Sequence, residues 1–331
     1  MKKVYYIAVL ALVAVIISVS YFCFWFKSNM KPVSTSDEKI SFIVVKGKSA
    51  SQIGEELYKK HLIRNSMIFK LYVQFFDKSK SINAGEFELS PSMSVSEIVS
   101  ALGKGPKELW VTIPEGLRKE EVVEKIITSL EMEGDREDVF REEFLSLAKD
   151  SEGYLFPDTY LFPRNVQAKT VYDRLKSIFN QKYDGEVVLP KDNNHTKSEI
   201  VIMASILERE TKAASEKPVV AGILWKRVEN GWPLQVDASV QYAVANLGKS
   251  DNWWPILTLD DLNINSSYNT YKFKGLPPAP ICNPGIVSLK AAANPQDSEF
   301  WFYIHSPDGR IHYAKTSEEH SSNVRKYLGG S

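Results

Sequence analysis

Two glutamates that stand two positions apart, Glu208 and Glu210, are the residues of this sequence best suited to proton transfer. They follow an apolar run, residues 200–207, which begins just after the capping-box signal Thr196-x-x-Glu199. We therefore expect a buried helix that ends in two acidic residues. A carboxylate resists desolvation, and the C-terminal end of a helix carries the negative end of its dipole. Both effects raise the pKa of a carboxyl group, as a general acid working near neutral pH requires.

Helix geometry separates the two glutamates. Residues i and i+2 of a helix point about 200° apart, so both carboxylates cannot face one scissile bond. They are therefore not the carboxylate pair of an ordinary glycosidase, whose members lie about 5 or 6.5–9.5 Å apart. One is expected to face a cleft and the other to hold structure, and the pattern does not say which. The alternative is a surface turn in which Arg209 and Lys212 neutralise both glutamates.

Polar residues in two later segments are candidates for binding a substrate beside the acidic pair. The first segment, residues 234–242, sets polar side chains among apolar ones. The second, residues 267–285, is dense in proline and glycine, which fix the path of a loop and favour a polar wall for a substrate. Each candidate is equally open to a structural role. Together with Glu208, the candidate substrate-binding residues are Gln235, Asp237, Tyr268, Asn269, Thr270 and Asn283.

The sequence gives no support to cofactor, metal or nucleic-acid chemistry. Of two cysteines, Cys23 lies in an apolar run and Cys282 lies among prolines with no base nearby, so neither a disulfide framework nor a zinc spacing is present. His305 and His312 flank a turn signal at residues 306–309 and are expected across a hairpin, but two ligands without a third rarely hold a metal. The net charge of zero argues against a nucleic-acid partner.

The N-terminus is expected to anchor the chain in the cytoplasmic (inner) membrane. Residues 4–26 form an uncharged run, and about 20 apolar residues cross a bilayer core. The run ends in bulky aromatic residues that suit the membrane interface and make a poor signal-peptidase site, which favours a retained single span over a cleaved signal. We expect residues 1–3 as a cytoplasmic tip, residues 27–39 as a linker, and the bulk of the chain outside the membrane.

The remainder is expected to be an α+β protein of several parts. A small αβ module covers residues 40–105, with strands near 40–45 and 84–89 and helices near 51–60, 66–76 and 94–103. A connecting αβ region covers 106–195, and a mixed α/β catalytic domain covers 196–331. The aromatic and proline-rich stretch 152–163 is expected to pack as core, with stacking on sugar rings as the alternative.

Several motifs together resemble the YceG-like family of endolytic murein transglycosylases. They are "EGYLFPDTY", "ASILERET", "LQVDASVQYAV", "SSYNTY", "GLPPAPICNPG" and "SLKAAANP". The resemblance covers nearly the whole chain. The stretches "GKSASQIGEEL" and "GEFELSPSMSVSEIVSAL" in the N-terminal module look LysM-like, which implies carbohydrate contact where the residues alone indicate only packing. Two departures from the family pattern, "LERET" and "VDAS", leave the catalytic position unchanged.

The resemblance implies a lyase that cleaves MurNAc–GlcNAc bonds within nascent glycan strands and leaves 1,6-anhydro-MurNAc ends. It places the catalytic glutamate at Glu210 and implies peptidoglycan as substrate, no cofactor, and coupling to peptidoglycan synthases. The MurNAc 6-hydroxyl would be the nucleophile, so one carboxylate suffices. Two alternatives stay open: a hydrolytic muramidase that pairs Glu210 with Asp237, and a non-enzymatic scaffold that binds the cell wall.

Overall fold

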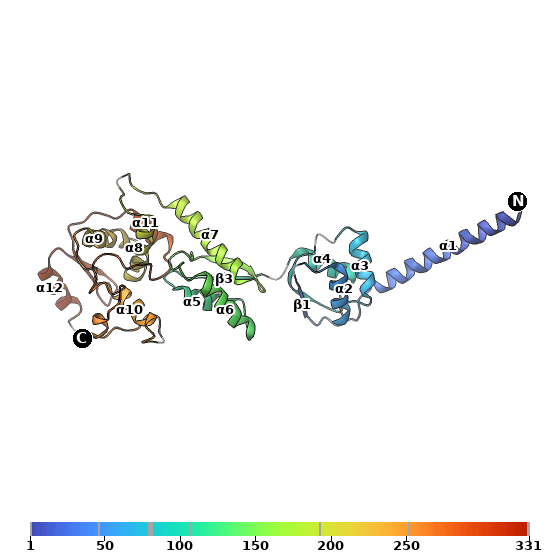
Figure 1. Ribbon diagram of the computed structural model, residues 1–331, viewed down its shortest axis with the longest axis horizontal. Coiled ribbons are helices and arrows are strands. Elements are labelled where there is room, and N and C mark those ends of the chain that lie inside the picture. Colours follow the sequence, from blue (N-terminus) through green and yellow to red (C-terminus); the bar gives the residue numbers. More distant parts are fainter. Residues whose placement is uncertain are drawn as a thin grey trace. The chain divides into compact units, whose positions relative to one another are not determined.

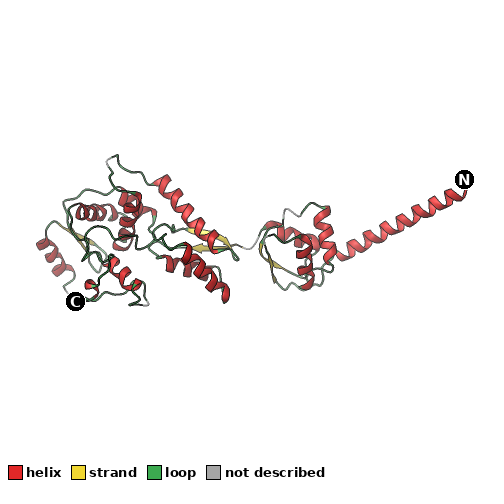
Figure 2. Cartoon of the chain, in the orientation of Figure 1, coloured by secondary structure: helices red, strands yellow, loops and turns green. Residues whose placement is uncertain are grey.

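The computed structural model describes residues 2–45, 47–78, 82–105, 108–191, 193–250 and 252–329. In these described residues, helices predominate and three short two-stranded sheets accompany them (Figures 1 and 2). The chain divides into two compact units. The first contains Met1–Leu109 and Leu161–Val166, and the second contains Trp110–Tyr160 and Gln167–Ser331. The fold is thus mixed α+β, as expected.

One apolar helix, α1 (Lys2–Asn29), begins the first unit. Its segment Leu12–Asn29 has a mean hydropathy of 1.5 and is not buried within the structure, so it is long and apolar enough to cross a membrane. Such a helix is consistent with a membrane anchor or with a signal sequence. The segment that follows, expected as a linker, lies against the rest of the unit: the Arg64 side chain donates to the Pro32 carbonyl, and the Ser34 amide donates to the Pro91 carbonyl.

The rest of the first unit contains the predicted strands and helices. Strand β1 (Ile40–Val44) pairs antiparallel with β2 (Gly85–Leu89), with Phe42 opposite Phe87. Helices α2 (Ala50–Lys59), α3 (Ser66–Phe75) and α4 (Val95–Lys104) share an apolar core with this pair. Each helix begins where the sequence offers a capping side chain, which satisfies free backbone amides of the first turn. The caps are Ser49, Asn65 and Ser94.

Strands β3 (Glu108–Thr112) and β4 (Thr159–Pro163) pair with each other, and the boundary between the two units runs through both strands. Helices α5 (Lys119–Ser129) and α6 (Asp135–Leu147) lie between these strands in sequence, and α7 (Ala168–Glu186) follows β4. Most apolar side chains of the stretch 152–163 are buried, so that stretch packs as core.

The second unit is built around α8 (Lys197–Glu210), which begins at the predicted capping box of Thr196 and Glu199. Residues 200–207 of α8 are all buried. Helices α9 (Lys217–Glu229), α10 (Asp237–Asn246) and α11 (Ile286–Ala293) pack around it. A hairpin of β5 (Phe302–His305) and β6 (Ile311–Ala314) forms across the predicted turn and precedes α12 (Ser317–Tyr327). Within the described part of residues 196–331, this hairpin is the only sheet, so the region is more helical than the expected mixed α/β domain.

Candidate active site

The carboxylate of Glu208 is held by three protein groups. It accepts hydrogen bonds from the Ser288 hydroxyl at 2.7 Å and the Gly285 amide at 3.0 Å, and it pairs with the Lys217 ammonium at 3.2 Å. Both ionic side chains are nearly buried, with 10% of Glu208 and 6% of Lys217 exposed. These contacts tie the end of α8 to the starts of α9 and α11. Glu208 therefore has a structural position, although it was a candidate for substrate binding.

Glu210 points elsewhere, into a cavity of about 510 Å³. Its carboxylate accepts one hydrogen bond, from the Tyr303 hydroxyl at 2.8 Å. The separation expected from the i, i+2 spacing is thus observed: one glutamate is bonded within the fold and the other faces a cavity. The cavity is lined by Glu210, Arg227, Gln235, Asp237, Tyr271, Phe302, Tyr303, Ile304, Ser317 and His320.

The surroundings of Glu210 favour its protonated form. Burial raises the pKa of this carboxyl group above its ordinary value, and the nearby Asp237 charge raises it further. The Tyr303 hydrogen bond and the positive charge of Arg227 act in the opposite direction and lower the pKa. The net shift is upward, which is the direction that a general acid needs.

Asp237 and Gln235 enter the same cavity from the beginning of α10. Asp237 accepts a 2.6 Å hydrogen bond from the Tyr271 hydroxyl. Gln235 has a φ of 54°, in the left-handed region that a residue other than glycine rarely adopts. Its backbone amide donates to the Thr270 carbonyl, which helps hold this conformation beside the cavity. Strained backbone at such a place is typical of functional sites.

Three other candidates use their polar atoms inside the protein. The Asn269 amide donates to two carbonyls of the preceding loop, and the Thr270 hydroxyl accepts from the Val236 amide. Asn283 bonds the Leu117 carbonyl, the Leu155 amide and Glu152. All three are almost fully buried, so the polar wall expected of their loop is an internal brace that fixes the chain around the cavity.

Tyr268 lies at a second cavity, of about 440 Å³, together with Glu152 and Tyr242. Its ring faces that of Tyr242, with centroids 4.8 Å apart. Cys282 is also buried, where its thiol contacts the Ser205 carbonyl at 3.2 Å, and burial raises the thiol pKa. This position does not suit a nucleophile, which must reach its substrate as a thiolate.

Sequence reasoning missed two side chains that lower the pKa of Glu210, Tyr303 and Arg227. Tyr303 comes from β5, and Arg227 comes from the last turn of α9, where Lys226 and Glu229 give it the look of an ordinary charged helix end. Arg227 donates to the carbonyls of Leu234 and Trp301, so its charge is fixed at the cavity wall. For Tyr303, one available signal was a polar group on the largely apolar segment 300–304, since buried polar groups require partners.

A comparison with family profiles shows to which protein family the chain belongs. The profile of the YceG-like family matches residues 42–326, which include most of both units and every residue lining the cavity around Glu210. This chain is a member of the YceG-like family.

Relatives of this YceG-like chain include two named endolytic murein transglycosylases. One, from Streptococcus pneumoniae, is 25% identical over 365 residues and covers 98% of this chain. The chain spans 65% of that relative's length. The other, from Bacillus subtilis, is 28% identical over 334 residues, covering 91% of this chain and 89% of the relative. A crystal structure of a putative YceG-like protein from Listeria monocytogenes is similar, with a TM-score of 0.55, 28% identity, and coverage of 87% of this chain and 99% of that one.

A buried carboxyl group of the YceG-like fold, Glu152, is expected to make stability depend on pH. It accepts from the Lys119 amide and from Asn283, and burial raises its pKa to about 7. The pKa of Glu152 is higher in the folded state than in the unfolded state. The stabilising contribution of this carboxyl group is therefore fully present below its unfolded pKa near 4.5, and it is lost as pH rises through its folded pKa of about 7. Relative to Glu152→Gln, the wild-type free energy of unfolding should fall by about 3 kcal/mol across this window.

Urea unfolding of both proteins at pH 5 and pH 8 measures this difference. The Gln variant keeps the size of the side chain and an oxygen that accepts from the Lys119 amide, so packing is matched. If the free energy of unfolding changed with pH in the same way in both proteins, burial would not raise the pKa of Glu152.

Proposed function

We propose that this chain is a membrane-anchored lytic transglycosylase that cleaves MurNAc–GlcNAc β-1,4 bonds within nascent peptidoglycan strands and leaves 1,6-anhydro-MurNAc ends. Membership of the YceG-like family and the names of the relatives support it. The observation that carries the proposal is the contrast between two neighbouring carboxylates. The Glu208 carboxylate has three protein partners. Glu210 instead faces a cavity, and the pKa of its carboxyl group is raised.

The reaction needs one carboxyl group that acts twice. Protonated Glu210 donates to the glycosidic oxygen as the bond to MurNAc C1 breaks through an oxocarbenium-like state. The resulting carboxylate then takes the proton of the MurNAc 6-hydroxyl, whose oxygen bonds C1. No water is added, and Glu210 returns to its protonated form. Asp237 places negative charge beside the cavity, where it stabilises positive charge that develops on the sugar ring.

The products distinguish this reaction from hydrolysis. Mass spectrometry of purified glycan strands digested by the wild-type chain should show new anhydro ends and early products of intermediate length. Hydrolysis has one structural point in its favour, because Asp237 lines the same cavity as Glu210 and could activate water. New reducing ends, lost in Asp237→Asn, would establish the hydrolytic muramidase and reject the transglycosylase.

Removing the Tyr303 hydroxyl tests whether the protonated form of Glu210 starts the reaction. Its hydrogen bond lowers the pKa of Glu210, so Tyr303→Phe should raise that pKa. If the protonated form of Glu210 starts the reaction, activity falls as pH rises through its pKa, and the variant should keep activity to higher pH. The measurement is the pH profile of strand cleavage. Tyr271→Phe is the matched control, because it also removes a tyrosine hydroxyl at the cavity, but one that donates to Asp237. If activity fell at the same alkaline pH in Tyr303→Phe and wild type, Glu210 would not be the group that must be protonated.

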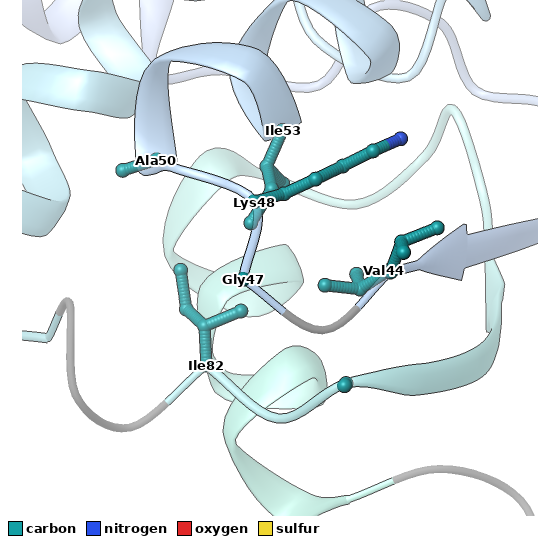
Figure 3. A pocket seen from close by; sticks show the side chains of 8 residues that line it. Val44, Gly47, Lys48, Ala50, Ile53 and Ile82 are labelled. Atoms are coloured by element: carbon teal, nitrogen blue, oxygen red, sulfur yellow. The ribbon is translucent and has the colours of Figure 1, made fainter.

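The N-terminal module is part of the proposal as a LysM-like glycan contact. A small cavity of about 140 Å³ lies between the turn from β1 to α2 and the segment before β2 (Figure 3). Gly47 and Lys48 belong to that turn, and Ile82 faces them from the other segment. Sedimentation of the Glu210→Gln chain with glycan strands tests the contact. Adding Ile82→Trp, which enlarges a side chain that lines the cavity, should lower the bound fraction, and unchanged binding would remove the module from substrate recognition.

We further propose that α1 is a retained anchor in the cytoplasmic membrane, with the N-terminus inside and the catalytic part outside. The uncharged span and its aromatic end support this placement. This position faces the site where new strands emerge, and it makes peptidoglycan synthases the expected partners. An intact N-terminal mass for the membrane fraction, with protease sensitivity only from the outside, is the expected result; a mass beginning after residue 26 would reject the anchor.

A further inference from the structure

An apolar hollow lies where α1 joins the first unit. Its volume is about 250 Å³. Four residues of the last turns of α1 form one side, and the aromatic pair at the end of α3, Phe75 and Phe76, forms the other. Both Phe75 and Phe76 are largely exposed, at 69% and 57%. The four residues from α1 are Phe22, Cys23, Phe26 and Lys27.

The end of α1 packs against the N-terminal module. Trp25, Phe26 and Met30 pack against the apolar core that α2, α3 and α4 share. The Val95 amide, at the start of α4, donates to the Met30 carbonyl at 3.1 Å. The depth at which α1 sits in a membrane therefore also sets the depth of Phe75 and Phe76.

Helix geometry gives that depth. An α-helix rises about 1.5 Å per residue, so about 20 residues cross a hydrocarbon core of about 30 Å. A span that starts at Val4, after the last charged residue of the N-terminal tip, reaches the far boundary near Cys23. Phe75 and Phe76 share the hollow with Phe22–Lys27, so they lie at this boundary as well. Aromatic side chains are favoured there, and Lys27 and Lys31 lie on its outer side, where lipid phosphates lie.

We propose that Phe75 and Phe76, with the last turns of α1, form a lipid-binding surface that takes an acyl chain of the surrounding membrane. This inference rests on the proposed anchor. A lipid occupant fits because the hollow is continuous with the lipid-facing helix, is almost wholly apolar, and has lysine at its outer rim. The contact gives the module a second attachment to the membrane surface, beside the span itself.

The test uses the full chain in vesicles of phosphatidylethanolamine and phosphatidylglycerol, labelled with a polarity-sensitive fluorophore on single cysteines. The labelled sites are native Cys23 and, in a Cys23→Ser background, Phe75→Cys and Phe76→Cys. Cys282 is buried and stays unlabelled in the folded protein. Val139→Cys is the matched control, since Val139 is 62% exposed but lies on the acidic helix α6. Lipids carrying a nitroxide near the top of the acyl chain serve as quenchers.

We expect loss of fluorescence at positions 75 and 76 comparable to that at Cys23, and none at position 139. Quenching at Cys23 without quenching at 75 and 76 would overturn the lipid contact and leave the anchor intact. Blue-shifted but unquenched labels at 75 and 76 would overturn it in favour of a protein occupant. An unquenched Cys23 would reject the anchor and the contact together, while the glycan products would still test the enzyme separately.

Discussion

Replacing Glu210 by glutamine is expected to lower the rate of glycan strand cleavage by at least about a hundredfold, the usual contribution of a positioned general acid. Glutamine keeps the shape of the side chain and an oxygen that accepts from Tyr303, but it has no proton to donate. The rate is measured as anhydro ends formed per unit time, by liquid chromatography and mass spectrometry of digested strands.

The thermal midpoint of the Glu210→Gln protein is the control for folding. It should equal or exceed that of the wild type at neutral pH. The pKa of Glu210 is raised in the folded state, so its stabilising contribution is lost as pH rises, and the neutral amide avoids that loss. Undiminished cleavage by a folded Glu210→Gln protein would remove Glu210 from the mechanism and favour the scaffold.

Glu208→Gln is expected to act on stability, with a loss of about 3 kcal/mol in the free energy of unfolding. The Lys217 ammonium, which is nearly buried, would lose the carboxylate that it pairs with at 3.2 Å, and it would keep the carbonyls of Leu207 and Thr211 and the weaker attraction of Glu115. An unpaired buried charge costs about 3–5 kcal/mol when one partner of such a pair is removed. Denaturant unfolding measures the change.

The double variant Glu208→Gln with Lys217→Met is the matched control. It removes both charges, so part of the lost stability should return. If Glu208→Gln instead kept the wild-type stability and lost strand cleavage, the two glutamates would have exchanged roles, with Glu208 acting on substrate.

The elements around the site were predictable because their signals are local. The capping box at Thr196 fixes the first turn of α8, and the spacing of Glu208 and Glu210 forces their side chains apart whatever surrounds them. The caps at Ser49 and Ser94 fix α2 and α4 in the same way. Such signals involve residues a few positions apart, so no knowledge of the tertiary fold is needed to read them.

The remainder of the site depends on contacts between distant segments. Tyr303 reaches Glu210 across 93 positions of sequence, and the bonds that occupy Asn283 come from residues 117, 152 and 155. A polar residue on a proline-rich loop has the same local pattern whether it faces a substrate or braces the loop. The burial of Asn269 and Thr270, which decides between these roles, is set by packing with the segments around α10 and η2 (Asp261–Asn263).

The paired strands β3 and β4 have a consequence for how this protein can be recombined. Because residues 161–166 belong to the first unit although they follow residue 160 of the second, the chain crosses the boundary three times. A chimera joined once near residue 109 would take residues 1–109 of its first unit from one parent and residues 161–166 of the same unit from the other parent. An intact exchange needs two segments transplanted together. Gene fusion at a single point therefore divides the first unit between two parents.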